Sequence, residues 1–177
     1  MFSKIKNYFL QRYLSDHKPH RHKVLTSLDY AQTVGIICEI TDENSYKDIM
    51  QLFASLNKEH KVKMIGYTQG KEVPFYCLPQ LTADYFCDKH LNWFGNPQTV
   101  QIQDFLDFDF DMLIDFNYRT NLPIHALLAQ SKAKFIIGRN EESSQYYDLF
   151  INTSSESNQT FIEDIITYTK KLTGNDK

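Results

Sequence analysis

The sequence is poor in glycine and proline, which limits how much of it can be linker or disorder. It has six glycines and five prolines among 177 residues, against 13 phenylalanines and 11 tyrosines. Disordered chains show the opposite balance, because they lack the aromatic residues that build a core. With 42% hydrophobic residues, a chain of this length can bury a core of its own. The composition predicts one folded domain.

Cysteine is scarce too, and no apolar run is long. Cys38, Cys77 and Cys87 are an odd number without regular spacing, which predicts reduced thiols rather than a disulfide framework. No segment approaches the roughly 18 apolar residues of a membrane span. The short apolar stretch at 8–10 is followed at once by polar residues, unlike a signal peptide. We expect a soluble, cytoplasmic protein.

Catalytic and nucleotide-binding motifs are missing as well. There is no G-x-S-x-G, P-loop or H-E-x-x-H pattern. A dinucleotide site needs a glycine-rich turn after the first strand, where backbone approaches the pyrophosphate. The turn here is TDENS (41–45), in which Asp42 and Glu43 would repel phosphate. We expect no cofactor, and whether the protein is an enzyme stays open.

Charge is distributed unevenly along the chain. The net charge of −3 and the pI near 6.0 give no general attraction to nucleic acid or anionic lipid. Residues 1–23, however, hold six basic residues and one acidic residue, a formal charge of +5, whereas the rest holds 13 basic and 21 acidic residues, −8. The six basic residues are Lys4, Lys6, Arg12, Lys18, Arg21 and Lys23.

Residues 2–14 predict a basic amphipathic helix. Bulky residues recur there at helical spacing: Phe2, Ile5, Phe9 and Tyr13. The next segment, 16–23, contains a proline and no bulky apolar residue, which predicts a linker. We therefore divide the chain into a helix and linker (1–23) and a single α/β domain (24–177).

Strand and helix patterns alternate beyond residue 24. Apolar runs predict strands at 33–40, 61–67, 110–116, 134–138 and 147–151, with a short edge strand at 73–77. Capping residues and helical spacing predict helices at 41–56, 99–106, 121–131 and 161–172. Residues 81–97 show neither period, and we expect an ordered connection there.

This alternation predicts an open, mostly parallel Rossmann-like α/β sheet with helices on both faces, preceded by the amphipathic helix. Ligands of such sheets bind beyond the carboxyl ends of the strands where strand order reverses, here between the strands ending at Ile40 and Phe116. Polar residues that the fold gathers along that edge are Thr41, Asp42, Asp115, Asn117, Arg119, Arg139 and Asn152. Asp115 could act as a base and Arg139 as an anion clamp, or both could serve as helix caps and structural contacts.

Three groups contain metal-ligand residue types, and each has a structural interpretation. The aspartates at 104, 107, 109, 111 and 115 interleave with phenylalanines, as solvent-facing residues beside core residues would. Cys77, Cys87 and His90 supply only three of the four ligands of a zinc site. The histidines at 17, 20 and 22 lie in the predicted linker. We predict no metal site.

Four segments resemble a family of small uncharacterised cytoplasmic proteins of the Bacteroidota: HLNWFGNP (90–97), FDMLIDF (110–116), SKAKFIIG (131–138) and YYDLFI (146–151). The resemblance covers residues 30–170 and implies a bacterial domain of unknown function. Residues 110–139 also resemble the amino-terminal half of heptosyltransferase-type glycosyltransferases. That second resemblance implies a half that lacks the nucleotide-sugar site.

Two function hypotheses follow. In the first, the protein is a non-enzymatic binding or adaptor domain whose basic N-terminus contacts RNA or a ribonucleoprotein assembly, with peripheral membrane contact as the other option. The apolar side of the helix could instead simply pack on the domain, because so short a helix needs a partner. In the second, the protein is a small enzyme or sensor that binds an anionic metabolite, its identity unknown, at the strand edge.

Overall fold

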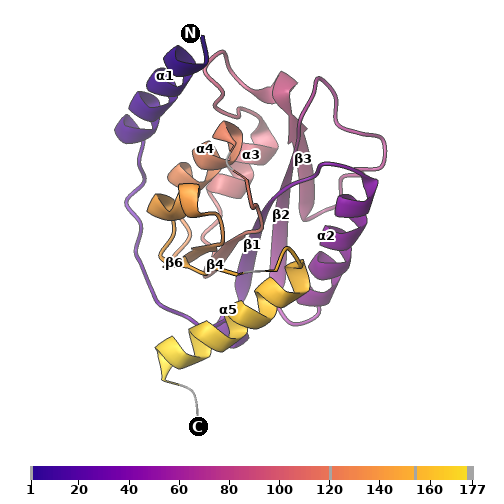
Figure 1. Cartoon of the computed structure of the whole chain (residues 1–177), viewed down its shortest axis with the longest axis vertical. Coiled ribbons are helices and arrows are strands. Elements are labelled where there is room, and N and C mark those ends of the chain that lie inside the picture. The colour runs from indigo at the N-terminus through magenta and orange to yellow at the C-terminus, as the bar shows by residue number, and fades with distance from the viewer. Residues whose placement is uncertain (1, 120, 154, 175–177) are drawn as a thin grey trace.

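A six-stranded parallel sheet forms the centre of the protein in the computed structural model, which describes residues 2–119, 121–153 and 155–174 (Figure 1). Its strands are β1 (Thr33–Glu39), β2 (Lys61–Thr68), β3 (Ala83–Cys87), β4 (Met112–Asp115), β5 (Ile136–Gly138) and β6 (Leu149–Phe150). They lie in the order β3-β2-β1-β4-β5-β6, and every neighbouring pair is parallel. This is the order of Rossmann folds, so the predicted fold class is confirmed.

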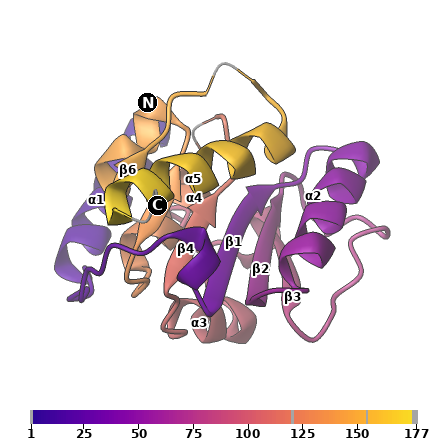
Figure 2. The same ribbon diagram turned by 90° about the horizontal axis from the view of Figure 1, so that it is seen from below.

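Helices cover both faces of the sheet. The apolar cluster on one face includes residues of α2 (Glu43–Leu56) and α5 (Asn158–Thr173), and the cluster on the other includes α3 (Val100–Leu106) and α4 (Leu122–Gln130). Figure 2 shows α5 and α3 on opposite sides. In β1, Ile36 contributes to the first cluster and Ile37 to the second, because successive side chains point to opposite faces.

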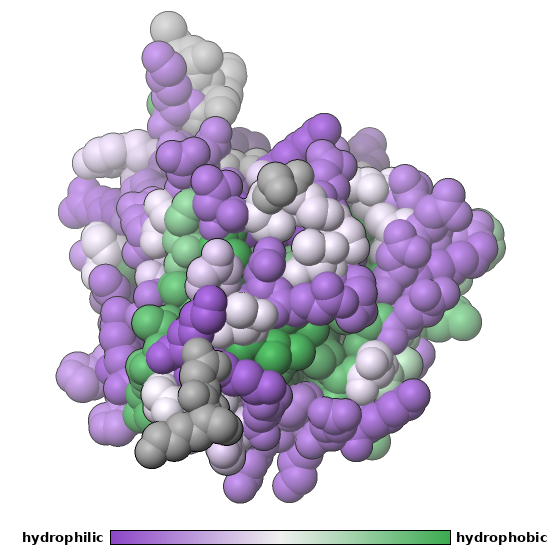
Figure 3. All heavy atoms as spheres, turned by 60° about the horizontal axis from the view of Figure 1, so that its bottom comes forward, coloured by the Kyte–Doolittle hydropathy of each residue, from purple (hydrophilic) through white to green (hydrophobic). Residues whose placement is uncertain are grey.

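Because both faces of the sheet are covered by apolar side chains, polar residues make up most of the surface. Figure 3 shows the lower side of the molecule as mostly hydrophilic, with hydrophobic residues visible mainly in a recess near its centre.

Strand β1 is buried along its middle five residues, as expected of a strand with neighbours on both edges and helices on both faces. β1 therefore lies in the interior of the sheet, between β2 and β4.

Capping residues define the helix ends as predicted. Asn121 Oδ1 accepts a hydrogen bond from Ile124 N at 2.8 Å, and Pro123 stands in the first turn, where its missing N–H costs nothing. Thr99 caps α3 in the same way. Gly174 ends α5 with a φ of +70°, a conformation that favours glycine.

The edge strand was predicted in the wrong place. Residues 73–77 form a turn, closed by a hydrogen bond from Cys77 N to Pro74 O at 3.0 Å, and the strand at this edge is β3. The aromatic ring of Tyr76 lies 5.7 Å from that of Tyr46 on α2, so the turn packs on a helix instead of extending the sheet. β3 was not predicted because its sequence, ADYFC, does not alternate between polar and apolar residues.

Helix α1 (Phe2–Asp16) forms as predicted but packs through different residues. Leu10 and Leu14 are its buried side chains, and they contact Ala126 of α4. The expected apolar face is largely outward: Ile5 is 45% and Phe9 is 40% exposed. The side chain of Phe2, also assigned to that face, lies outside the described part of the structure. The leucines pack against Ala126 and Ala129 of α4, small residues that leave room for them. The helix is therefore turned about its axis relative to the predicted orientation.

The segment that follows α1, residues 17–27, is here called the strap, and it is bonded to residues just before β5 and β6. Arg21 Nε donates to Ala133 O at 2.8 Å, and Val24 N donates to Lys134 O at 3.2 Å. The guanidinium of Arg21 also forms an ion pair with Asp148. The strap joins α1 to the short helix η1 (Leu28–Tyr30), which packs beside α5 (Figure 1).

Leu10→Ala is expected to weaken the docking of α1 on α4 by about 2–5 kcal/mol, because it removes a fully buried side chain. Urea unfolding followed by the fluorescence of Trp93, the one tryptophan, reports the change, since its ring lies 4.9 Å from that of Phe9 on α1. The control, Ile5→Ala, should alter stability by no more than about 0.5 kcal/mol. Equal effects of both substitutions would contradict the observed packing.

Candidate functional site

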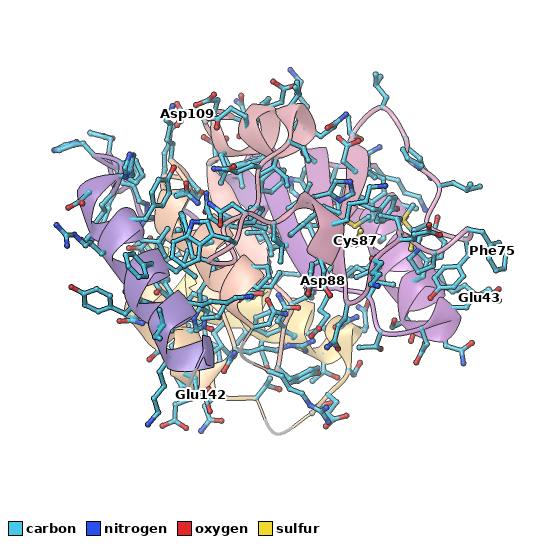
Figure 4. The ribbon with its side chains drawn as sticks, turned by 90° about the horizontal axis from the view of Figure 1, so that it is seen from above. Glu43, Phe75, Cys87, Asp88, Asp109 and Glu142 are labelled. Atoms are coloured by element: carbon cyan, nitrogen blue, oxygen red, sulfur yellow. The ribbon has the colours of Figure 1, made fainter. Side chains whose placement is uncertain are left out.

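The strand order reverses between β1 and β4, where the predicted binding edge lies. Figure 4 views the molecule from above and labels Glu43 after β1, Asp88 after β3 and Glu142 after β5. All three follow the carboxyl ends of parallel strands, but in Figure 4 they lie well apart from one another.

A buried carboxyl group lies at the centre of the edge. Asp115, the last residue of β4, is fully buried and accepts hydrogen bonds from Tyr147 Oη at 2.6 Å and Asn117 N at 3.1 Å. The side-chain amide of Asn117 also donates to Asp115, and its oxygen accepts from Glu39 N at 2.6 Å. Asn117 therefore ties the end of β4 to the end of β1.

Burial changes the acidity of this group. It raises the pKa of Asp115 from 3.8 to about 6, although the hydrogen bonds from Tyr147 and Asn117 act in the opposite direction. Burial and the nearby carboxylate raise the pKa of Tyr147 above its usual value, so the phenol remains a donor. The tyrosine ring lies directly over Gly138, where a Cβ would lie 2.1 Å from Tyr147 Cζ. Glycine at this position allows the ring to reach Asp115.

A second group of buried polar residues lies in the chain after β5. Ser143, in the short helix η3 (Glu141–Tyr146), shares a 2.9 Å hydrogen bond with His125 Nε2. Its hydroxyl also accepts from Asn140 Nδ2 at 3.1 Å. Burial lowers the pKa of His125, which favours the neutral ring. A serine beside a histidine can form a nucleophilic pair, but both are buried, so we assign these residues a structural role.

Arg139 follows β5 and directs its charge inward. Its Nη2 donates to Phe116 O at 2.7 Å and to Asn158 Oδ1 at 2.6 Å, and Nη1 donates to Ser157 O at 3.3 Å. The guanidinium carbon lies 3.6 Å from the centre of the Tyr118 ring. Burial lowers the pKa of Arg139 to about 10, so it stays charged at neutral pH. These contacts join the end of β4 to the start of α5.

The remaining predicted edge residues lie apart from Asp115. Asp42 caps α2, since its Oδ1 accepts from Ser45 N at 2.8 Å. Thr41, Arg119 and Asn152 are exposed. The structure therefore brings Asp115, Asn117 and Arg139 together at the strand edge and leaves the other four residues at its rim.

The candidate metal ligands have other partners. Asp107 Oδ1 accepts from Lys132 Nζ at 2.5 Å, and Asp111 Oδ2 accepts from Thr33 N at 3.1 Å. Cys87 N donates to His90 Nδ1 at 3.0 Å. Throughout the described ranges, no three His, Cys, Asp or Glu side chains gather closely enough to hold a metal ion.

The outward side of α1 combines positive charge with aromatic rings. Lys4, Lys6 and Arg12 are exposed, and so are Tyr8 at 61% and Trp93 at 59%. Rings contact one another in a row: Tyr8 with Phe9, Phe9 with Trp93, Trp93 with Phe94, and Phe94 with Tyr13. The three exposed rings of this series are Tyr8, Phe9 and Trp93, and we call them the aromatic row.

In the part of the chain that is described, no helix has the length and apolarity to span a membrane.

The basic residues of the strap have a different environment from those of α1. Arg21 and Lys23 both pair with Asp148, with Lys23 Nζ 2.8 Å from Asp148 Oδ1. Burial opposes ionisation of Asp148, but the hydrogen bonds from Arg21 and Lys23 outweigh it and lower the pKa of this carboxyl group. Lys18 is exposed. The six predicted contact residues thus divide into three on α1 and three on the strap.

Several residues of these two regions were not identified from the sequence. Tyr147, His125 and Asp148 reach their partners only through tertiary contacts far apart along the chain. Trp93 was visible as an aromatic residue without a period, and its proximity to Phe9 depends on the docking of α1.

The fold and the edge network define a Rossmann-ordered parallel α/β domain in which a buried, hydrogen-bonded carboxyl group occupies the edge and the first turn has no glycine. The chain belongs to a family of unknown function, DUF6913, which matches residues 3–172. No curated protein and no solved structure matches it. Because the match begins at residue 3, the family includes α1 and the strap along with the sheet.

Asp115→Asn is expected to change how stability depends on pH. The pKa of Asp115 is higher in the folded protein than in the unfolded chain, so its contribution to stability is fully present below about pH 4 and is lost as pH rises through 6. Asparagine does not titrate. The free energy of unfolding of wild type should therefore fall relative to the variant by on the order of 2–3 kcal/mol between pH 4 and 7, measured by urea denaturation. A pH-independent difference would contradict the raised pKa.

Proposed function

We propose that this protein is a non-enzymatic binding domain that contacts single-stranded RNA through the outward side of α1. The observation that carries the proposal is the aromatic row beside Lys4, Lys6 and Arg12, on a helix whose leucines are already buried. Proteins that bind single strands combine cationic grooves for the backbone with aromatic rings on which bases stack.

The packing of α1 supports this use of its outer side. Leu10 and Leu14 pack the helix on α4, and the contact of Phe9 with Trp93 adds to this docking while both rings stay partly exposed. The rings of Phe9 and Trp93 are held at 4.9 Å from each other, which limits the entropy lost when a base stacks on them. A row of exposed rings that the fold holds in place is therefore available to a partner.

The charges favour RNA over other partners. The protein is acidic overall, but residues 1–23, which form α1 and part of the strap, hold six basic residues and one acidic residue. Figure 4 shows α1 at one end of the molecule and Glu43 at the other, with the exposed Phe75 beside it. A polyanion would thus be drawn to the end that carries α1. A membrane surface is the competing partner, but the outer side of α1 lacks the wide apolar stripe of membrane-bound helices, because charged residues interrupt it.

The cellular setting and wider kinship are part of the proposal. We propose a cytoplasmic bacterial protein with relatives in the Bacteroidota, on the strength of the four sequence segments named above. Kinship with the amino-terminal half of heptosyltransferases rests on residues 110–139 alone. In the structure this range spans β4, α4 and β5, a strand-helix-strand unit common to many parallel sheets.

The second function hypothesis, a small enzyme or sensor that binds an anionic metabolite at the strand edge, has less support. Arg139, its proposed anion clamp, donates to Phe116 O, Ser157 O and Asn158 Oδ1 and is 6% exposed. Asp115, its proposed base, is enclosed by Tyr147 and Asn117. An anion would have to displace contacts that join β4 to α5.

RNA binding is tested with a fluorescein-labelled single-stranded oligonucleotide and fluorescence anisotropy. A variant carrying Lys4→Glu, Lys6→Glu and Arg12→Glu should bind at least about tenfold more weakly, and the slope of log K against log salt should fall by about 2. Tyr8→Ala should cost about tenfold without changing the slope, because stacking is worth about 1–3 kcal/mol per base.

The control carries Lys58→Glu and Lys61→Glu, at two exposed residues away from α1. Its RNA affinity should be closer to that of wild type than the affinity of the α1 variant is. Equal RNA affinity of wild type and the α1 variant would contradict the proposal. Binding to anionic vesicles together with no binding to RNA would assign this surface to a membrane instead.

A further inference from the structure

A cavity of about 420 Å³ lies between α1, the strap, α4 and η3. Its size falls within the range of small-molecule sites. Among the residues that line it, three are cations, Lys18, Arg21 and Lys23, and none is acidic, so the chemistry of the cavity favours an anion.

The charge beside the cavity matches a dianion. Lys18, Arg21 and Lys23 carry three positive charges, and Asp148, paired with Arg21 and Lys23, cancels one of them. Two positive charges of these residues remain. A phosphate monoester carries close to two negative charges at neutral pH. Carboxylates carry only one, and so match less well.

The other walls suit a flat ring. Leu14, Leu128 and Ala129 provide an apolar surface, and Tyr146 and Tyr147 provide aromatic surfaces. Tyr146 is held by His125, whose ring centre lies 5.2 Å away, and Tyr147 is held by its hydrogen bond to Asp115. Amides of Gln11 and Gln145 can donate to or accept from a polar ring edge.

We propose that this cavity binds a phosphate monoester joined to a flat ring, the chemistry of a nucleoside monophosphate or of the 5′-terminal nucleotide of an RNA. Lys18 contacts the phosphate, and the ring lies against Tyr146. Arg21 and Lys23 are positioning residues, because both pair with Asp148 and Arg21 Nε also donates to Ala133 O. The cavity does not depend on the RNA contact proposed for α1, since Lys4, Lys6 and Tyr8 do not line it.

Isothermal titration calorimetry of the full chain with adenosine monophosphate, adenosine and inorganic phosphate tests the proposal. We expect adenosine monophosphate to bind at least about tenfold more tightly than either fragment, because only it fills both parts of the cavity. Lys18→Glu should weaken that binding by about tenfold or more. Lys18 is exposed, so its substitution should leave the fold intact. The matched control, Lys58→Glu at an exposed residue away from the cavity, should change the affinity less than twofold.

Oligonucleotides with a 5′-phosphate or a 5′-hydroxyl distinguish the two sources of the phosphate. A preference for the 5′-phosphate that Lys18→Glu abolishes supports an RNA end, and binding of adenosine monophosphate without that preference supports a free metabolite. No binding of adenosine monophosphate, equal affinity for adenosine, or equal losses from Lys18→Glu and Lys58→Glu would overturn the proposal. None of these outcomes requires the α1 surface to bind RNA.

Discussion

The carboxylate of Asp148 holds the N-terminal segment against the sheet, and both proposed binding surfaces depend on it. One of its oxygens accepts from Ile136 N at 2.9 Å, next to a backbone bond from Asp148 N to Ile136 O at 2.8 Å. The same carboxylate pairs with Arg21 and Lys23. Asp148, just before β6, thus connects the sheet to the strap, together with the bonds from Arg21 Nε to Ala133 O and from Val24 N to Lys134 O. The strap in turn forms one wall of the cavity and sets where α1 meets α4.

A second buried carboxyl group organises the opposite part of the architecture. Asp115 gathers Tyr147 and Asn117 at the point where strand order reverses, which is where related folds bind their ligands. In this protein the position is filled by internal hydrogen bonds, and Gly138 gives the tyrosine ring the room it needs. Tyr147 also lines the cavity, so the edge network supports one of its walls. The available surfaces are therefore displaced from the strand edge toward α1 and the strap.

The sequence predicted the parallel α/β fold and most of its elements because their signals are local: apolar runs for β1 and β2, caps such as Asp42 and Asn121 for the helices. The predictions from the sequence were wrong where contacts between distant parts of the chain determine the structure. β3 has no alternating pattern, and the buried side of α1 is set by the small residues of α4 rather than by the bulkiest residues of the helix. The role of Asp148 was invisible, since its partners lie more than 100 residues away along the chain.

Hydrogen–deuterium exchange of wild type and an Asp148→Asn variant tests most directly whether Asp148 holds the N-terminal segment in place. Asparagine can still accept from Ile136 N but cannot form ion pairs with Arg21 and Lys23. The account predicts that amides of α1 and the strap exchange about tenfold or more faster in the variant, while those of β1, β2 and β4 keep their protection. Unchanged protection of α1 would contradict it, and would mean that Leu10 and Leu14 alone hold the helix.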